Sequence, residues 1–151
     1  MIFLEKIENL TPDIDADLAE NAASLALKHQ SAAGVDLTIV LSDDAQLHEL
    51  NRQWMNVDAP TDVLSFPSDE IDPETGSRYQ GDILISVERA AEQAKAAGHT
   101  VEAEVQLLVI HGVLHLMGHD HATADEKAKM WQAQAEILGQ LGLADIQVRE
   151  Q

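Results

Sequence analysis

Four of the seven histidines in this chain of 151 residues fall within one short segment, at the spacing of metal ligands. His111 and His115 are four residues apart, so on a helix they lie on the same face, about one turn from each other. Gly118 then allows a sharp turn, after which His121 can fold back as a third ligand. The pattern predicts that His111, His115 and His121 bind one cation, since buried polar groups without a partner each cost roughly 1–3 kcal/mol.

The ligand types favour zinc, and they favour a catalytic site. Neutral imidazole nitrogens suit zinc, although copper, nickel and iron are compatible with the same ligands. The chain contains no cysteine, so a structural zinc site closed by thiolates is excluded, and three histidines with one open position are the catalytic arrangement. No cluster of carboxylates in the sequence indicates a second metal, so we expect one zinc ion per chain. Such an ion polarises a phosphoryl or carbonyl oxygen and lowers the pKa of bound water to about 7.

The absence of one glutamate narrows the class of reaction that this site could catalyse. The segment matches the zinc-peptidase pattern H-E-x-x-H-x-x-G-x-x-H except at the glutamate that serves as general base, where this chain has Gly112. The nearest acids in the sequence, Asp120 and Glu104, do not occupy that place. A zinc peptidase or amidase would therefore need a displaced base such as Asp120. A phosphodiester needs less from a general acid, because the metal charge stabilises its alkoxide leaving group.

The histidine segment, residues 111–121, resembles the signature of the YbeY family of bacterial endoribonucleases, which are also called rRNA maturation factors. Further blocks in the family's order are LNR at 50–52, DAPTDVLSF at 58–66, GDI at 81–83 and GHT at 98–100. The resemblance implies a zinc-dependent endoribonuclease that is selective for single-stranded RNA. It implies action in small-subunit rRNA 3′ end maturation and ribosome quality control, with RNA and the ribosome or ribosomal proteins as partners. It also implies that His111, His115 and His121 are the zinc ligands and catalytic residues.

The sequence departs from the family at one position that matters for catalysis. The arginine that usually follows an aromatic residue falls on Met55, after Trp54. Arginine binds phosphate through two parallel hydrogen bonds, so we predict that Arg52, about one turn earlier, takes over phosphate binding and a catalytic role. Trp54 has helical spacing with Leu47 and Leu50, which predicts a core position, although its ring would also suit stacking on a base.

Three further residues are predicted to belong to the site. Asp62 and Ser65 are expected to bind substrate from a strand that lines the cleft beside the metal, the alternative being a turn cap and an ordinary strand residue. Asp120 is expected to take part in catalysis by orienting a ligand histidine, or else to cap the turn. His119 stands where many family members have tyrosine, and we do not assign it as a ligand.

The charge of the chain bears on its partners. Nine Lys and Arg stand against 27 Asp and Glu, for a formal net charge of −18, and such a surface repels nucleic acid and anionic lipid on average. The basic residues are scattered, so composition alone does not indicate an RNA-binding protein. We expect weak, salt-sensitive binding to isolated RNA, compensated by the metal, by a local patch around Arg52 and Arg78, or by a ribosomal partner. A non-catalytic, ribosome-associated module with a structural metal is a third interpretation.

Periodicity predicts a single α+β domain over residues 1–151, with about five helices around a small mixed four-stranded sheet. Expected strands are 1–7, 35–41, 63–66 and 83–86, and expected helices are 12–29, 43–55, 87–97, 101–117 and 124–141. The helix that carries His111 and His115 is apolar on every side, so it should be the buried central helix of a metalloprotease-like fold. Residues 68–81 are polar and rich in turn formers, and we expect a long surface loop there.

The sequence also predicts where in the cell the protein is found. It has no stretch of 18 apolar residues, so nothing is expected to span a membrane. The first residues lack the basic region and apolar run of a secretory signal, and the absence of cysteine fits a reducing environment. We therefore expect a cytoplasmic protein with no membrane partner.

Overall fold

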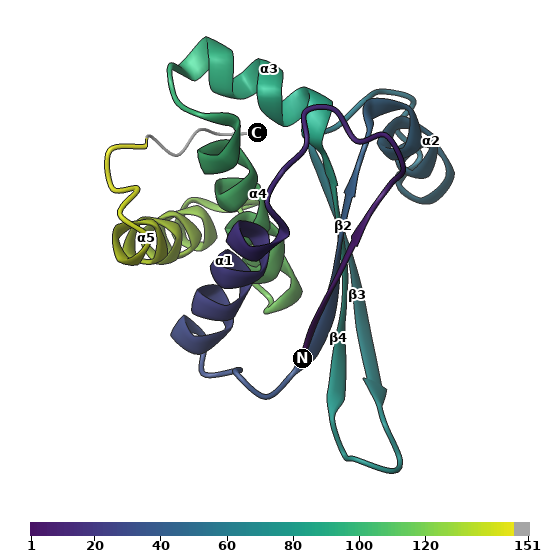
Figure 1. Cartoon of the computed structure of the whole chain (residues 1–151). Helices are drawn as coiled ribbons and strands as arrows, with labels where there is room; N and C mark the ends of the chain where they lie inside the picture. Colours follow the sequence, from purple (N-terminus) through teal and green to yellow (C-terminus); the bar gives the residue numbers. More distant parts are fainter. Residues whose placement is uncertain (147–151) are drawn as a thin grey trace.

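The computed structural model describes residues 1–146, which form five α-helices and four β-strands and confirm the predicted α+β class (Figure 1). In chain order the elements are β1 (Ile2–Lys6), α1 (Ala16–His29), β2 (Asp36–Ser42), α2 (Asp44–Met55), β3 (Val63–Ile71), β4 (Arg78–Ser86), α3 (Val87–Ala97), α4 (Val101–Leu116) and α5 (Ala124–Gln140). The strands form one mixed sheet in the order β1-β2-β4-β3, in which β3 is antiparallel to β4 and the other neighbours are parallel.

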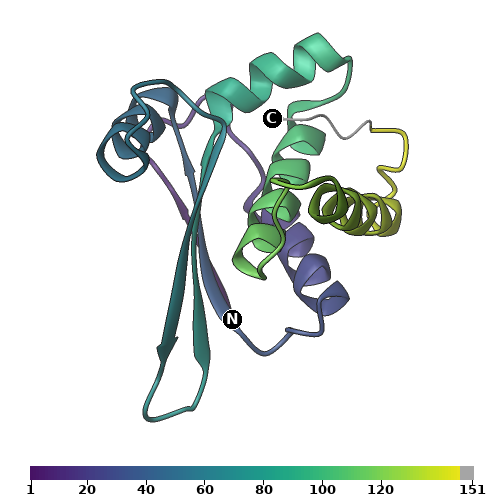
Figure 2. The same ribbon diagram turned by 180° about the vertical axis from the view of Figure 1, so that it is seen from behind.

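The helices cover the two faces of the sheet unequally. α1, α4 and α5 lie on one side of the sheet, and α2 lies on the other (Figure 1, Figure 2). Side chains alternate between faces along a strand, and β4 follows this rule. Ile83 and Ile85 belong to the main core, while Leu84 belongs to the smaller apolar cluster under α2. The main core therefore lies between the sheet and α4.

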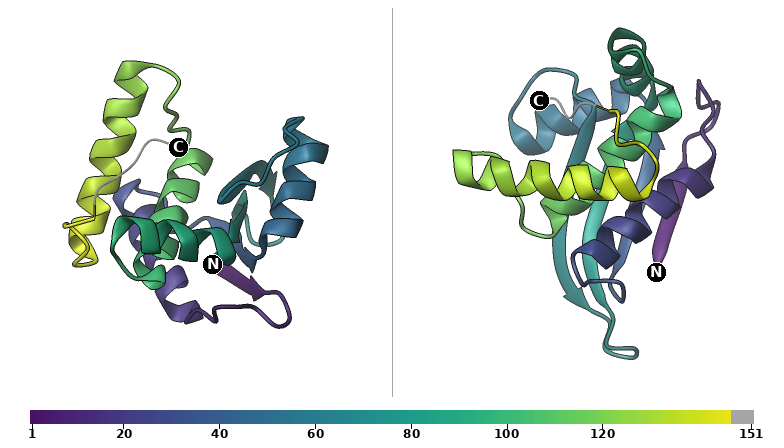
Figure 3. Two further views of the ribbon diagram at one scale, coloured as in Figure 1. Left: turned by 90° about the horizontal axis from the view of Figure 1, so that it is seen from above. Right: turned by 90° about the vertical axis from the view of Figure 1, so that its left-hand side faces the viewer.

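The central helix α4 is buried on nearly all sides. Of its 16 residues, 13 are buried, and it packs against α1, α3 and α5 as well as β3 and β4. Figure 3 shows α5 lying across α1 and α4 on the side away from the sheet. Because it is packed on all these sides, α4 provides a fixed platform for His111 and His115.

Within residues 1–146, neither α4 nor any other helix is both long and apolar enough to cross a membrane.

The predicted long loop at 68–81 is wrong. β3 continues to Ile71 and β4 starts at Arg78, and the two strands form a hairpin that projects from the body of the protein (Figure 1). The turn is closed by the N–H of Asp72, which donates to the carbonyl of Ser77 at 2.9 Å. Toward its tip most side chains of the hairpin are exposed. Without a buried face, its strands lack the apolar alternation that distinguishes a strand from a polar loop.

Helix α1 begins later than predicted. The Asp15 side chain supplies the N-cap by accepting from the N–H of Asp17, so the helix starts at Ala16. Both Thr11 and Asp15 are residue types that cap helices, but the hydroxyl of Thr11 donates to the carbonyl of Asn9 at 3.2 Å instead. The C-terminal end agrees with the prediction, because α1 ends at His29.

Candidate metal centre

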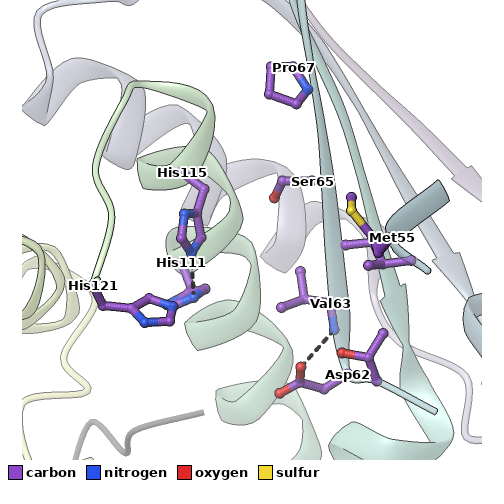
Figure 4. A pocket seen from close by; sticks show the side chains of 10 residues that line it. Met55, Asp62, Val63, Ser65, Pro67, His111, His115 and His121 are labelled. Carbon is purple, nitrogen blue, oxygen red and sulfur yellow. Dashed lines mark hydrogen bonds between the residues drawn. The ribbon is translucent and has the colours of Figure 1, made fainter. Parts of the chain in front are cut away.

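Three imidazole rings converge at the C-terminal end of α4 (Figure 4). His111 and His115 lie one turn apart on α4, with their Nε2 atoms 3.0 Å from each other. His121 approaches from the loop that follows, with its ring centroid 5.8 Å from that of His111 and 5.3 Å from that of His115. One nitrogen of each ring lies within 4.8 Å of the others. The structure therefore brings the three predicted ligands together.

The turn after α4 returns His121 to this point. Gly118 has a φ of +95°, a left-handed conformation that glycine adopts without steric cost. The N–H of His119 donates to the carbonyl of Leu114 at 2.9 Å, which folds the chain back against the last turn of α4. α5 begins directly after its N-cap, Thr123. His121 is therefore held in a short segment between two helix ends.

His111 is oriented by a buried partner from α5. It is 5% exposed, and its Nδ1 lies 3.2 Å from Oε1 of Gln134, which is fully buried. An amide oxygen only accepts hydrogen bonds, so Nδ1 carries the hydrogen and Nε2 presents its lone pair to the other histidines. Burial, together with the charges of His115 and His121, lowers the pKa of His111 to about 4, and burial also lowers the pKa of His115. Both rings are therefore neutral at pH 7, the state that metal binding requires.

An indole ring completes the surroundings of the histidines. Trp131 on α5 packs edge-on against His111 and His121, with ring centroids 6.2 and 5.8 Å apart. The Nζ of Lys127 lies 5.6 Å from the centroid of Trp131. Sequence reasoning missed both Gln134 and Trp131, because neither belongs to a recognisable motif. Their spacing of three residues on a predicted helix was the one available signal.

The residues present fit a zinc ion. Tetrahedral ligands at Zn–N distances of about 2.0–2.1 Å hold their nitrogens roughly 3.3 Å apart. The Nε2 atoms of His111 and His115 are 3.0 Å apart, and the whole set lies within 4.8 Å, so small ring rotations suffice. All three donors are imidazole nitrogens, which suit zinc and other first-row metals. The chemistry of the donor set is thus that of a transition-metal site.

A cleft of about 400 Å³ opens beside the three histidines. Its opposite wall is formed by the start of β3 and the loop before it, together with Met55 from the end of α2 (Figure 4). Asp62 and Ser65 both line this wall. The structure therefore places these two predicted substrate-binding residues across the cleft from the histidines.

Asp62 and Ser65 also have partners within the fold. Asp62 accepts from the N–H of Val63 at 2.8 Å and from the amide of Gln93 at 3.3 Å. Burial raises the pKa of the Asp62 carboxyl. The hydroxyl of Ser65 donates to the carbonyl of Gly112 at 3.4 Å, which links β3 to α4. Both side chains are therefore held in fixed positions on this wall of the cleft.

Neither Arg52 nor Trp54 lines the cleft beside the histidines. Arg52 forms an exposed ion pair with Glu49 on the same helix. The residue of α2 that lines the cleft is Met55. Trp54 is 67% exposed, so the predicted core position is wrong. The apolar cluster under α2 includes Leu47 and Leu50 but not Trp54, which lies one turn further along the helix.

Asp120 caps the turn that carries His121. Its Oδ1 accepts from the backbone N–H of His121 at 2.7 Å, which is the second of the two roles expected for it. Its negative charge partly offsets the lowering of the pKa of His115. His119, which was not assigned as a ligand, donates through Nε2 to Oε1 of Gln30 at 2.9 Å.

The position of the missing glutamate has no room for a side chain. A Cβ on Gly112 would lie 2.7 Å from Cγ2 of Ile83, a fully buried residue of β4. A glutamate at this position would point at the sheet, so it could not serve as the general base of the zinc-peptidase pattern. The close packing of α4 on β4 therefore requires glycine at this position.

Comparisons with known proteins agree with the resemblance of the motifs. Residues 5–142 match the family model described as Endoribonuclease YbeY. Endoribonuclease YbeY of Roseiflexus castenholzii is 44% identical over 137 residues, which cover 87% of this chain and 86% of that protein. The Carboxydothermus hydrogenoformans protein of the same name is 43% identical over 146 residues, covering 93% and 99%. A solution structure from Thermotoga maritima matches with a TM-score of 0.60 and 26% identity, covering 100% of this chain and 99% of that one.

Proposed function

This chain belongs to the YbeY endoribonuclease family, and we propose that it is a zinc-dependent endoribonuclease that cuts single-stranded RNA during rRNA maturation. The observation that supports this most strongly is the convergence of three imidazole rings beside an open cleft. The names of its relatives support the class of substrate. The absence of the general-base glutamate, whose place is taken by Gly112, favours a phosphodiester over a peptide as the bond that is cut.

His111, His115 and His121 would hold one zinc ion per chain. When bound, zinc supplies a positive charge that polarises a phosphoryl oxygen and activates water. The contribution of the chain is to keep the ring nitrogens neutral and directed at one point. Gln134 does this for His111 by fixing the hydrogen on Nδ1. Asp120 holds the backbone of His121 in its turn.

Asp62 and Ser65 are proposed to bind the RNA from the opposite wall of the cleft. A carboxylate accepts hydrogen bonds, and a hydroxyl both donates and accepts. The pair therefore suits a ribose 2′-hydroxyl and a phosphate oxygen, and the 2′-hydroxyl is the group that distinguishes RNA from DNA. Attack on phosphorus comes from water or from the ribose 2′-hydroxyl. The second route leaves a cyclic phosphate, so analysis of the ends of cleaved RNA distinguishes the two.

Arg52 is proposed to bind phosphate in place of the arginine that is absent at Met55. Both residues lie in the last turns of α2, and Met55 lines the cleft. The ion pair of Arg52 with Glu49 is exposed, and exposed ion pairs contribute little to stability. A phosphate, which accepts two parallel hydrogen bonds from a guanidinium, can therefore compete with Glu49 for Arg52.

The charge of the chain indicates how the substrate is delivered. A net charge of −18 opposes strong binding to free RNA. We infer that the ribosome or ribosomal proteins present the RNA to the cleft in the cytoplasm, in small-subunit 3′ end maturation and in ribosome quality control. Binding to isolated RNA is then weak and falls steeply with added salt.

The test uses one oligoribonucleotide, presented single-stranded or as a duplex with its complement. We expect the wild-type protein to cut the single strand and leave the duplex intact. His115→Ala should stay folded and cut neither, which would also count against a non-catalytic module. Equal cleavage by His115→Ala and wild type would overturn the proposal. Cleavage of an unstructured peptide but of no RNA would support the zinc peptidase instead.

A further inference from the structure

A series of three hydrogen bonds joins the end of α1 to the surroundings of the metal centre. The Nε2–H of His119 donates to Oε1 of Gln30 at 2.9 Å, and the amide of Gln30 donates to Nδ1 of His29 at 2.9 Å. The Nε2–H of His29 then donates to Glu136 on α5 at 2.5 Å. Every donor in the series meets an acceptor, with Nδ1 of His29 accepting and Nε2 of the same ring donating. We call His29 and Gln30 the α1 brace.

One end of the series holds the loop that carries His121. His119 stands two residues before His121, and its ring reaches from the loop to α1. The backbone of the loop is held to α4 at its start, where the N–H of Gly118 donates to the carbonyl of His115 at 3.0 Å. The bond to Gln30 adds an attachment to a second helix. The loop is therefore fixed from two directions just before the third ligand.

The other end of the series reaches the helix that orients His111. Glu136 follows Gln134 by two residues on α5, and Oε1 of Gln134 lies 3.2 Å from Nδ1 of His111. α1 and α5 also pack against each other, so the bond between His29 and Glu136 reinforces an existing helix contact. The α1 brace is thus connected to the supports of two ligands, although it contacts neither ring directly.

We propose that Gln30 is a positioning residue for the metal centre, which acts through His119 to hold the His121 loop in the geometry that binds the ion. The inference rests on the zinc site of the proposed function. A ligand on an ordered loop loses less conformational freedom when it binds. Groups that support metal ligands typically change metal affinity by about 10–100-fold. Because Gln30 acts through a loop, we expect the lower end of that range.

The test compares Gln30→Ala with the matched control Gln53→Ala, which removes another helix-end glutamine whose amide donates to Glu49. The Kd for Zn²⁺ is measured by competition with a coloured chelator. The visible absorption of Co²⁺-loaded protein reports the coordination geometry, and melting of the metal-free protein reports the fold. Gln30→Ala should raise the Kd for Zn²⁺ about tenfold and weaken the Co²⁺ absorption. Gln53→Ala should match wild type, and the two metal-free variants should melt alike.

Two further variants keep the test decisive if Gln30→Ala does not fold. His119→Phe keeps the bulk of the ring but removes the same hydrogen bond, so it should also raise the Kd about tenfold. Gln30→Glu keeps the acceptor and should bind Zn²⁺ within about threefold of wild type. Equal Zn²⁺ affinity in wild type, Gln30→Ala and His119→Phe would overturn the inference and leave the zinc site standing. A wild-type protein that binds no Zn²⁺ would overturn the zinc site and the inference with it.

Discussion

The Nδ1 atom of His111 and the Oε1 atom of Gln134 lie 3.2 Å apart in the interior, on two helices and 23 residues apart in the sequence. This contact decides which nitrogen of His111 carries the hydrogen and which one is free to bind a metal. Within residues 1–146, Nε2 of Gln134 has no hydrogen-bond partner. The oxygen that faces His111 is therefore the satisfied end of this buried amide.

Replacing Gln134 by leucine should separate its role in metal binding from its role in the core. Gln134→Leu keeps a similar volume but removes the acceptor for His111, so we expect the Zn²⁺ affinity to fall by about 10–100-fold. The free energy of unfolding of the metal-free protein should change by less than about 1.5 kcal/mol, because the lost hydrogen bond is offset by removal of an unpaired buried N–H. Chelator competition and urea unfolding measure the two quantities. A variant with wild-type Zn²⁺ affinity would contradict this role.

The low pKa of His111 predicts how the metal-free fold responds to acid. Burial and the two neighbouring histidines lower this pKa from 6.5 to about 4. Between these values the unfolded chain binds more protons than the folded one. The free energy of unfolding should therefore fall as the pH drops from 6.5 towards 4, by about 3 kcal/mol at most, while the full contribution is present above pH 6.5.

The measurement for this pH dependence is urea unfolding of metal-free wild type and His111→Asn at about pH 7 and about pH 5. Other groups titrate in both proteins, so the difference between the two isolates His111. Wild type should lose more stability than the variant on acidification. An equal loss in both proteins would show that the folded state protonates this ring as easily as the unfolded chain does.

The close approach of Gly112 and Ile83 predicts that substitutions at these two positions change the free energy of unfolding non-additively. A Cβ at Gly112 would lie 2.7 Å from Cγ2 of Ile83, so Gly112→Ala should lower the free energy of unfolding by about 1–3 kcal/mol. Ile83→Ala alone should cost about 2–5 kcal/mol because it leaves a cavity. In the double variant the added methyl occupies that space, so the double variant should be more stable than the sum of the single losses predicts. Additive losses would refute the steric account.

The exposed ion pair between Arg52 and Glu49 on α2 predicts that substitutions of its two members change the KM for RNA in opposite directions. Arg52→Ala should raise the KM for single-stranded RNA about fivefold, because it removes the proposed phosphate contact. Glu49→Gln should lower the KM, since it frees the guanidinium of Arg52. The double variant should behave as Arg52→Ala. Steady-state cleavage kinetics at low salt give these values, and an unchanged KM in Arg52→Ala would exclude the residue from substrate binding.

The histidine cluster was predictable from the sequence because its ligands are local. The period of the helix places His111 and His115 on one face, and Gly118 marks the turn that returns His121. The opposite wall of the cleft depends on long-range packing, so only the resemblance to a family pointed to Asp62 and Ser65. The burial of the central helix was predictable for a similar reason, since apolar residues occur on every side of it.

Other features depend on tertiary packing that leaves no local signal. The contact of Gln134 with His111 joins two helices, and the α1 brace joins residues separated by about a hundred positions. Trp54 follows the apolar period of α2 and is nevertheless exposed, because the cluster beneath that helix ends one turn earlier. The β3–β4 hairpin was missed for the converse reason, since its polar strands bury no apolar face near the tip, where backbone pairing and an exposed ion pair between Arg78 and Asp69 hold them together.

The most direct test of the zinc site is cleavage of single-stranded RNA before and after removal of the metal. The wild-type protein should contain about one zinc ion per chain, lose its cleavage activity when a chelator removes that ion, and regain it when Zn²⁺ is added back. A metal-free preparation that cuts RNA at the full wild-type rate would contradict the assignment of His111, His115 and His121 as a catalytic metal site.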